Sequence, residues 1–579
     1  MKIAAAQLNP TVGDIDGNAV KVVAARAKAA REGADLIVFP ELFITGYPPE
    51  DLVLKPAFQD AARSRVMALA KEFDDDGPGV LLGTIWVEDS KVYNAVVLLE
   101  KGEVAAVRYK VDLPNYGVFD EKRVFATGPL PGPIAFRGVK IGVPICEDIW
   151  TDEVTECLAE CGAELLIVPN GSPFDWKKPD VRLNIAVERV TETDLPLIYV
   201  NQVGGQDELV FDGGSFALDS DCRLVLQLPQ WTEELVVTEW QKVDGAWSCA
   251  KGPVAPLVEG DAAAYAACVL GLHDYVEKNG FPGVVLGLSG GIDSAIVAAL
   301  AVDALGPGRV HAVMLPYRYT SDASLKDAAD CANALGIRYD VVPINAPVEG
   351  FEQALAGLFE GTNADITEEN LQSRTRGTII MAISNKFGGM VLTTGNKSEM
   401  SVGYATLYGD MNGGFNPIKD LYKTEVYRLS RWRNAHRPPH AKGPGGIVIP
   451  ENILTKAPTA ELRENQTDQD SLPPYDALDD ILACLVEREM RVPDIIARGH
   501  APDTVKKVER LLYISEYKRR QAAPGVKISS RNFGRDRRYP ITNRFRENIA
   551  AGSGRTESTT HAQNVPKTVA PRADGGEVA

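Results

Sequence analysis

Histidine is rare in this chain, with 6 in 579 residues, and residues 1–250 contain none. A cysteine nucleophile in that stretch therefore cannot be paired with a histidine of the same stretch. Position 2 is Lys, which also excludes an enzyme whose nucleophile is an N-terminal cysteine. Any amide-cleaving chemistry in the first half must therefore use another acid–base system.

Cysteine and long apolar runs are also scarce. The 8 cysteines form no CxxC pair, which is too sparse a set for a disulfide scaffold and favours a reducing compartment. The apolar run at the start is too short for a signal peptide, and no run approaches the ~18 residues of a membrane span. Together these features predict a cytoplasmic protein without a membrane partner.

Positive charge is in deficit. Asp and Glu number 79 against 61 Lys and Arg, which gives a formal net charge of −18. This balance argues against general affinity for nucleic acid or anionic lipid, because phosphate backbones would be repelled. A small nucleotide stays possible if a bound cation screens it.

Strand-like and helix-like runs alternate along the chain, which predicts an α/β protein with two large domains. We place the first domain at residues 1–245 with a mixed sheet, in which residues 101–102 form a hairpin turn. A linker is expected over 246–260 and a doubly wound parallel-sheet domain over 261–550. Residues 551–579 lack apolar periodicity and are predicted to be a disordered tail.

The sharpest motif lies between a predicted strand and a predicted helix in the second half. Paired glycines there let the backbone approach an anion, and the helix N-terminus offers free N–H groups. A glycine-rich turn with a serine cap is the plain alternative, and the lysine of a Walker A motif is missing. The segment resembles the pyrophosphate loop (PP-loop) of ATP-pyrophosphatases and consists of Gly287, Leu288, Ser289, Gly290, Gly291, Ile292, Asp293 and Ser294.

A second polar cluster follows the strand predicted at 390–394, where ligands bind in open α/β sheets. It contains Thr394 and Glu399. Asp293 and Glu399 could hold Mg²⁺ on ATP phosphates, because a hard cation prefers carboxylate oxygens. The alternative for Glu399 is the first turn of a helix, capped by Ser398.

Residues 260–545 resemble the synthetase domain of the NAD synthetase family, with matching segments at 316–321, 461–470 and 516–521. The resemblance implies that the PP-loop and Thr394 bind ATP, and that Lys423 faces phosphate. It also implies that Asn370, Glu399 and Lys518 bind deamido-NAD. Without it, Lys518 would be read as part of a basic surface run.

Cys146 ends an apolar strand in the first half, at a position where a sharp turn can expose a nucleophile. A buried small apolar residue is the commoner reading of a free cysteine. Glu41 and Lys110 also follow strand-like runs, and a carboxylate with an ammonium can do acid–base work without histidine. Glu41, Lys110 and Cys146 match, in this order, the catalytic triad of the nitrilase superfamily, whose fold is an α-β-β-α sandwich.

Both halves together resemble glutamine-dependent NAD synthetases. The resemblance implies that glutamine binds at Tyr116, Ser172 and Lys178, with the register between Lys177 and Lys178 left open. It further implies the substrates glutamine, ATP and deamido-NAD, and a homo-oligomer that dimerises through the synthetase domain. The alternatives are an amidase with an ATP-binding regulatory domain, which would form no AMP, and a binding module with a dead ATP site.

Overall fold

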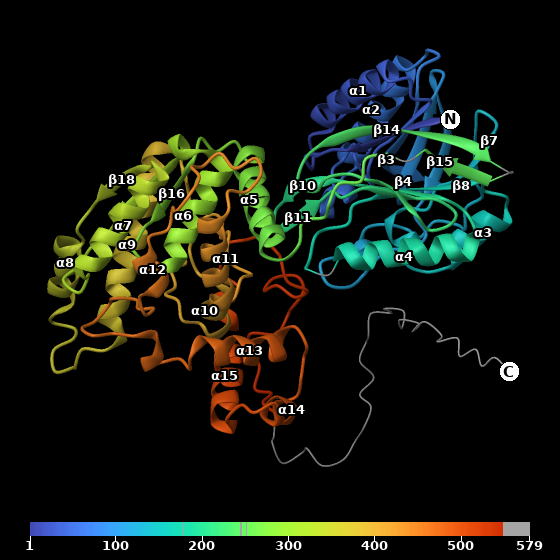
Figure 1. Ribbon diagram of the computed structural model, residues 1–579. Coiled ribbons are helices and arrows are strands. Elements are labelled where there is room, and N and C mark those ends of the chain that lie inside the picture. The colour runs from blue at the N-terminus through green and yellow to red at the C-terminus, as the bar shows by residue number, and fades with distance from the viewer. Residues whose placement is uncertain (177, 244–245, 251, 548–579) are drawn as a thin grey trace, which may run out of the picture.

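The computed structural model describes residues 1–547 except 177, 244, 245 and 251, and its chain folds into two α/β bodies (Figure 1). The predicted tail at 551–579 lies outside the described residues. In the part of the chain that the structure describes, no helix combines the length and the apolar character needed to span a bilayer.

Two sheets face each other in the N-terminal body. The first runs β15, β14, β1, β2, β3, β4, β5, with bounds Ala246–Cys249, Glu234–Val243, Lys2–Gln7, Leu36–Val38, Gly79–Glu88, Lys91–Glu100 and Glu103–Tyr109. The second runs β13, β12, β9, β8, β7, β6, with bounds Leu224–Gln227, Phe216–Leu218, Leu197–Asn201, Leu165–Asn170, Val139–Gly142 and Ile134–Phe136. The first sheet is mixed, and β4 and β5 form the hairpin expected at 101–102.

Alternation along the strands creates the layers. Ile3 and Ala5 of β1 point into the core between the sheets, whereas Ala4 and Ala6 pack under the helices of the outer face. Those helices are α1 (Ile15–Arg31) and α2 (Pro56–Glu72); α3 (Glu153–Glu160) and α4 (Lys178–Thr193) cover the second sheet in the same way. The α-β-β-α sandwich is therefore confirmed.

The expected linker at 246–260 begins later than the sequence suggests. Residues 246–249 form β15, which pairs with β14 in antiparallel register. Trp247 and Cys249 alternate inward and join the core between the sheets. The period-2 burial of these two side chains explains why the segment is a strand.

The C-terminal body is built on a parallel sheet in the order β18, β17, β16, β19, with bounds Arg338–Val341, Val310–Met314, Val284–Gly287 and Met390–Val391. Helices α8 (Asn345–Leu355) and α9 (Ile366–Phe387) cover one face. The other face carries α5, α6, α7 and α11, with bounds Gly260–Lys278, Ile292–Leu305, Asp322–Leu335 and Lys423–Ala435. This confirms the doubly wound domain and puts the carboxyl ends of the strands on one edge.

Helix α5 joins the two bodies by packing on the hairpin of β10 (Val203–Gln206) and β11 (Leu209–Asp212) (Figure 1). A Cβ on Gly205 would lie 3.0 Å from the Cα of Gly271, so the close approach depends on glycine. Asp274 accepts the Gly205 N–H at 2.7 Å, and Lys278 donates to the Gly205 carbonyl at 2.8 Å. The interface is therefore both close-packed and hydrogen-bonded.

A buried ion pair offers a test of the C-terminal core. Arg433 on α11 donates to Asp303 on α6 at 2.5 and 3.0 Å, and both side chains are fully buried. Asp303→Asn would leave the guanidinium charge unpaired, which costs about 3–5 kcal/mol. We expect calorimetry to show the melting temperature of this domain falling by at least about 5 °C.

The matched control is an exposed ion pair that also involves an arginine of α11. Arg428 pairs with Asp261 at the start of α5 and is 51% exposed. Asp261→Asn should cost less than about 1 kcal/mol. Equal shifts in the two variants would contradict the assignment of Arg433 and Asp303 as an internal support.

Candidate active sites

The N-terminal site forms where strands of the two facing sheets end. Glu41 follows β2, Lys110 follows β5, and Cys146 begins the short 3-10 helix η3 (Cys146–Ile149) after β7. Lys110 Nζ lies 2.7 Å from Glu41 Oε1, and both side chains are fully buried. Lys110 and Glu41 both act electrostatically on the Cys146 thiol. The chain therefore brings the three residues together across about a hundred positions of sequence.

A second carboxylate completes the surroundings of Lys110. Glu121 Oε1 lies 3.0 Å from Lys110 Nζ and accepts the Tyr47 hydroxyl at 2.9 Å. Burial opposes the charge of Lys110, but Glu121 and Glu41 outweigh it and raise the pKa of the lysine. Burial raises the pKa of Glu121 to about 7 despite the attraction of Lys110. Asn94 on β4 donates to the same oxygen of Glu41, Oε1, at 2.7 Å.

Cys146 occupies a constrained turn. Its φ is +48°, in the left-handed region that non-glycine residues seldom adopt, which is typical of functional sites. Burial raises the pKa of the thiol, with a further contribution from Glu41, and Lys110 opposes this. The thiol thus stays protonated at neutral pH until a base accepts its proton. The Gly171 N–H donates to Glu41 Oε2 at 2.9 Å, and a Cβ on Gly171 would crowd Tyr47.

Two of the residues predicted to bind glutamine lie beside Cys146. Tyr116 donates its hydroxyl to Glu147 at 2.8 Å. Lys178 Nζ lies 4.4 Å from the centroid of the Trp150 ring, and burial lowers its pKa. Lys177, the other choice of register, lies outside the described residues.

Ser172 is held by a residue that the sequence did not single out. Arg182 donates to Ser172 Oγ at 3.0 Å and to the Ser172 carbonyl at 2.7 Å, while its other nitrogen pairs with Asp212 at 2.8 Å. Asn201 Oδ1 accepts the Ser172 N–H at 3.0 Å. No local motif marks Arg182, because its partners come from distant strands.

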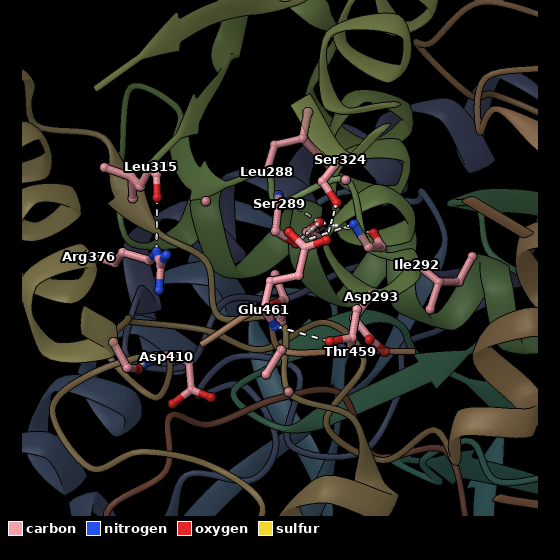
Figure 2. Close-up of a pocket in the computed structure, with 18 of the residues that line it drawn as sticks. Leu288, Ser289, Ile292, Asp293, Leu315, Ser324, Arg376, Asp410, Thr459 and Glu461 are labelled. Atoms are coloured by element: carbon pink, nitrogen blue, oxygen red, sulfur yellow. Dashed lines mark hydrogen bonds between the residues drawn. The ribbon is translucent and has the colours of Figure 1, made fainter. Parts of the chain in front are cut away.

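The C-terminal site is a cavity of about 310 Å³ at the carboxyl ends of β16, β17 and β19 (Figure 2). All eight PP-loop residues line it, together with Thr394, Glu399 and Lys423. Gly290 has φ +77°, and a Cβ there would lie 2.4 Å from the Ser324 carbonyl oxygen. Ser289 and Ser294 contact each other through their hydroxyls at 3.1 Å, so the loop carries polar groups into the cavity.

An ammonium and two carboxylates meet at the start of α6. Lys423 Nζ lies 2.5 Å from Asp293 Oδ2 and 3.2 Å from Glu399 Oε1. Burial opposes the charge of Lys423, but Asp293 and Glu399 raise its pKa. Burial, reinforced by Asp293, raises the pKa of Glu399 to about 8.

These two carboxylates suit a hard cation only as a partial ligand set. Among the described residues, no three His, Cys, Asp or Glu side chains are grouped as a metal cage. Mg²⁺ usually binds through one or two carboxylates plus substrate phosphates. Asp293 and Glu399, beside a phosphate-type loop, fit that pattern.

Asn370 and Lys518 lie away from the lining of the cavity but bind a loop that reaches it. Asn370 Oδ1 accepts the Thr406 hydroxyl at 2.9 Å, and Lys518 donates to the Gly403 carbonyl at 2.7 Å. Tyr404 of this loop lines the cavity.

Several further polar residues face the cavity without a role predicted from sequence. Figure 2 shows Arg376 donating to the Leu315 carbonyl. Glu461 accepts the Ser324 hydroxyl at 2.8 Å, and Asp410 also lines the cavity. Glu461 lies in the motif at 461–470, which was the only sequence signal for this group.

Comparisons with known proteins identify the family of each half of the chain. Residues 2–246 match the carbon-nitrogen hydrolase family and residues 264–522 match the NAD synthase family. A glutamine-dependent NAD(+) synthetase of Rhodobacter capsulatus is 53% identical over 94% of this chain and 99% of its own, and one of Xanthomonas campestris is 47% identical over 94% and 98%. The solved glutamine-dependent NAD+ synthetase of Acinetobacter baumannii, in complex with ADP, is 43% identical with a TM-score of 0.74 over 94% of this chain and 98% of that one.

The charges around Cys146 predict its reactivity. Glu41 is the carboxylate expected to accept the thiol proton, so Glu41→Gln should leave the buried thiol without a base. We expect iodoacetamide to alkylate Cys146 severalfold more slowly in this variant at pH 8, measured by peptide mass spectrometry with the exposed Cys161 as internal reference. Glu153→Gln, on the exposed start of α3, should leave the rate unchanged. Equal or faster alkylation in Glu41→Gln would contradict this account.

Proposed function

Because the chain belongs to the glutamine-dependent NAD(+) synthetases, we propose which of its residues carry each step of that reaction. The enzyme is a glutamine-hydrolysing carbon–nitrogen ligase with a nitrilase-type glutaminase domain and an NAD synthase domain. Glutamine supplies ammonia, which converts adenylated deamido-NAD into NAD as the last step of NAD biosynthesis.

In the first step, Glu41 accepts the thiol proton while Cys146 attacks the glutamine amide. The ammonium of Lys110 stabilises the oxyanion of the tetrahedral intermediate. Ammonia leaves, and water then hydrolyses the acyl-enzyme to glutamate. The observation that carries this assignment is the contact of 2.7 Å between Lys110 Nζ and Glu41 Oε1, both of them fully buried. Cys146, on whose thiol both residues act electrostatically, lies at a turn of positive φ in the core between the sheets.

Glutamine recognition follows from the charges around Cys146. Lys178 suits the α-carboxylate of glutamine, and Glu147, which accepts the Tyr116 hydroxyl, suits the α-ammonium group. Ser172 offers a hydroxyl whose oxygen already accepts from Arg182, which directs its proton toward another acceptor.

In the second step, the PP-loop and Thr394 bind ATP, and Lys423 contacts its phosphates. We assign Asp293 and Glu399 to Mg²⁺, which when bound neutralises phosphate charge. The nicotinate carboxylate of deamido-NAD attacks the α-phosphate, pyrophosphate leaves, and ammonia then displaces AMP. Asn370, Glu399 and Lys518 bind deamido-NAD.

We further assign the glutaminase domain to residues 1–245 with the β15 extension, the synthetase domain to 261–550, and the tail to 551–579. The eight cysteines are free, which supports a reducing, cytoplasmic setting. A homo-oligomer that dimerises through the synthetase domain is supported by the exposed apolar side chains of α8, α9 and the loop between them, namely Phe351, Leu358 and Ile366.

Cys146→Ala tests the glutaminase step. Glutamine-driven NAD formation should fall to background, because no other group can form the acyl-enzyme. Ammonium chloride should still support NAD formation, since the synthetase residues are unchanged. The matched control is Cys249→Ala, which removes a buried thiol from the same core between the sheets and should keep both activities. Glutamine-driven activity in Cys146→Ala would make the thiol structural.

The raised pKa of Glu399 predicts pH-dependent binding of Mg-ATP. Its folded pKa of about 8 lies above its unfolded value, so the free enzyme holds this proton below pH 8 and must release it when the carboxylate binds Mg²⁺. Affinity should therefore rise between pH 7 and 9.

Calorimetry in two buffers of different ionisation enthalpy measures the released proton directly. Glu399→Gln should bind more weakly and release no proton from this site, whereas Glu451→Gln on the exposed start of α12 (Glu451–Thr455) should behave as wild type. Proton release that persists in Glu399→Gln would contradict the assignment.

A further inference from the structure

Asp148 is a buried carboxylate beside the nucleophile that takes no part in the steps above. It is 1% exposed and lies in η3, two residues after Cys146. Its two oxygens accept three backbone N–H groups: Oδ2 accepts from Ile145 at 2.9 Å, and Oδ1 accepts from Val111 at 3.0 Å and from Asp112 at 2.7 Å. One side chain therefore contacts the residue before the nucleophile and the two residues after the catalytic lysine.

Only the first of these bonds is explained by local structure. The Ile145 N–H precedes η3, and a side chain in the first turn often caps such a group. The other two donors come from more than thirty residues away in sequence. A helix cap alone does not account for them.

The bonds from Val111 and Asp112 lie just beyond the end of strand β5. Strand β5 ends at Tyr109, which pairs with Ala95. The backbone N–H of Lys110 still donates to the Asn94 carbonyl at 2.8 Å, as in a strand. The next two backbone N–H groups, of Val111 and Asp112, donate to the Asp148 side chain instead. The backbone that carries Lys110 is thus held on one side by β4 and on the other by Asp148.

The bond from Ile145 holds the backbone next to the nucleophile, Cys146. Cys146 has φ +48°, a conformation that persists only where the surrounding structure enforces it. The Ile145 N–H bond holds the residue immediately before this turn. The same carboxylate therefore fixes the backbone of the nucleophile relative to the backbone of the lysine.

We propose that Asp148 is a positioning residue of the glutaminase step, which sets the distance between Lys110 Nζ and the oxyanion formed on the Cys146 adduct. This inference rests on the roles proposed for Cys146 and Lys110. Both oxygens of Asp148 must accept, so an amide of the same shape cannot replace it: its NH₂ would face a backbone N–H on one side or the other.

The test is Asp148→Asn in the full-length enzyme, with glutamine hydrolysis measured in the presence of ATP and deamido-NAD. We expect kcat to fall at least about tenfold, because a displacement near 1 Å at a reacting centre can cost about 100-fold. The KM for glutamine should stay within about twofold, since the hydrogen bonds of the Asp148 side chain go to backbone N–H groups and to none of the side chains assigned to glutamine. Ammonium-driven NAD formation should match wild type, while the melting temperature should fall by a few degrees, because a buried backbone N–H loses its acceptor.

Asp152→Asn is the matched control, because Asp152 is exposed, lies four residues further on and makes no side-chain cap bond. A normal kcat in Asp148→Asn would overturn the inference. A raised KM with normal kcat would make the residue part of glutamine binding instead. Parallel loss of glutamine-driven and ammonium-driven activity would make it a general support of the fold, which also overturns the inference.

Cys146→Ala is measured alongside to keep the two proposals separate. If Cys146→Ala still hydrolyses glutamine, the proposed function fails whatever Asp148→Asn does. If Cys146→Ala is inactive and Asp148→Asn is normal, only the positioning role fails.

Discussion

Each candidate active site is organised around a buried lysine ammonium. A buried charge is tolerated only when opposite charges and hydrogen bonds replace its hydration. Lys110 meets this condition with Glu41 and Glu121, and Lys423 meets it with Asp293 and other carboxylates. The same pairing raises the pKa of both lysines and keeps them charged although they are buried. The surrounding strands and glycines can be understood as the framework that brings those carboxylates to each lysine.

A third buried lysine joins the synthetase site to the end of the described chain. Lys397, at the start of α10 (Lys397–Val402), contacts Glu487 at 2.7 Å, Asp420 at 2.8 Å and the Ser529 hydroxyl at 2.7 Å. The carbonyl of Ile528, the residue before Ser529, accepts a hydrogen bond at 3.3 Å from the backbone N–H of Trp176 in the glutaminase domain. The last segment therefore contacts both domains, in addition to the α5 interface.

Sequence patterns predicted the parts of this enzyme that depend on local structure. The mixed sheet of the first half and the parallel sheet of the second follow from apolar periodicity, whereas the sandwich follows from the resemblance to the nitrilase superfamily. The PP-loop follows from strand, glycines and helix in succession. The roles of Asn94, Asp148 and Arg182 were not predicted, because Glu41, Val111 and Asp212, which they contact, are distant in sequence. No local spacing marks these three residues. The glycine and prolines of 246–260 predict a linker, whereas the inward-facing Trp247 and Cys249 place its first residues in a sheet.

Transfer of the glutamine nitrogen into NAD is the central claim, and isotope labelling tests it most directly. The enzyme would be given deamido-NAD, Mg-ATP and glutamine labelled with ¹⁵N in its side-chain amide, without added ammonium. The account predicts ¹⁵N in the carboxamide of the NAD product, with AMP and NAD formed in equal amounts. Unlabelled NAD, or glutamate released without matching AMP, would contradict it and would favour an amidase with a nucleotide-sensing domain.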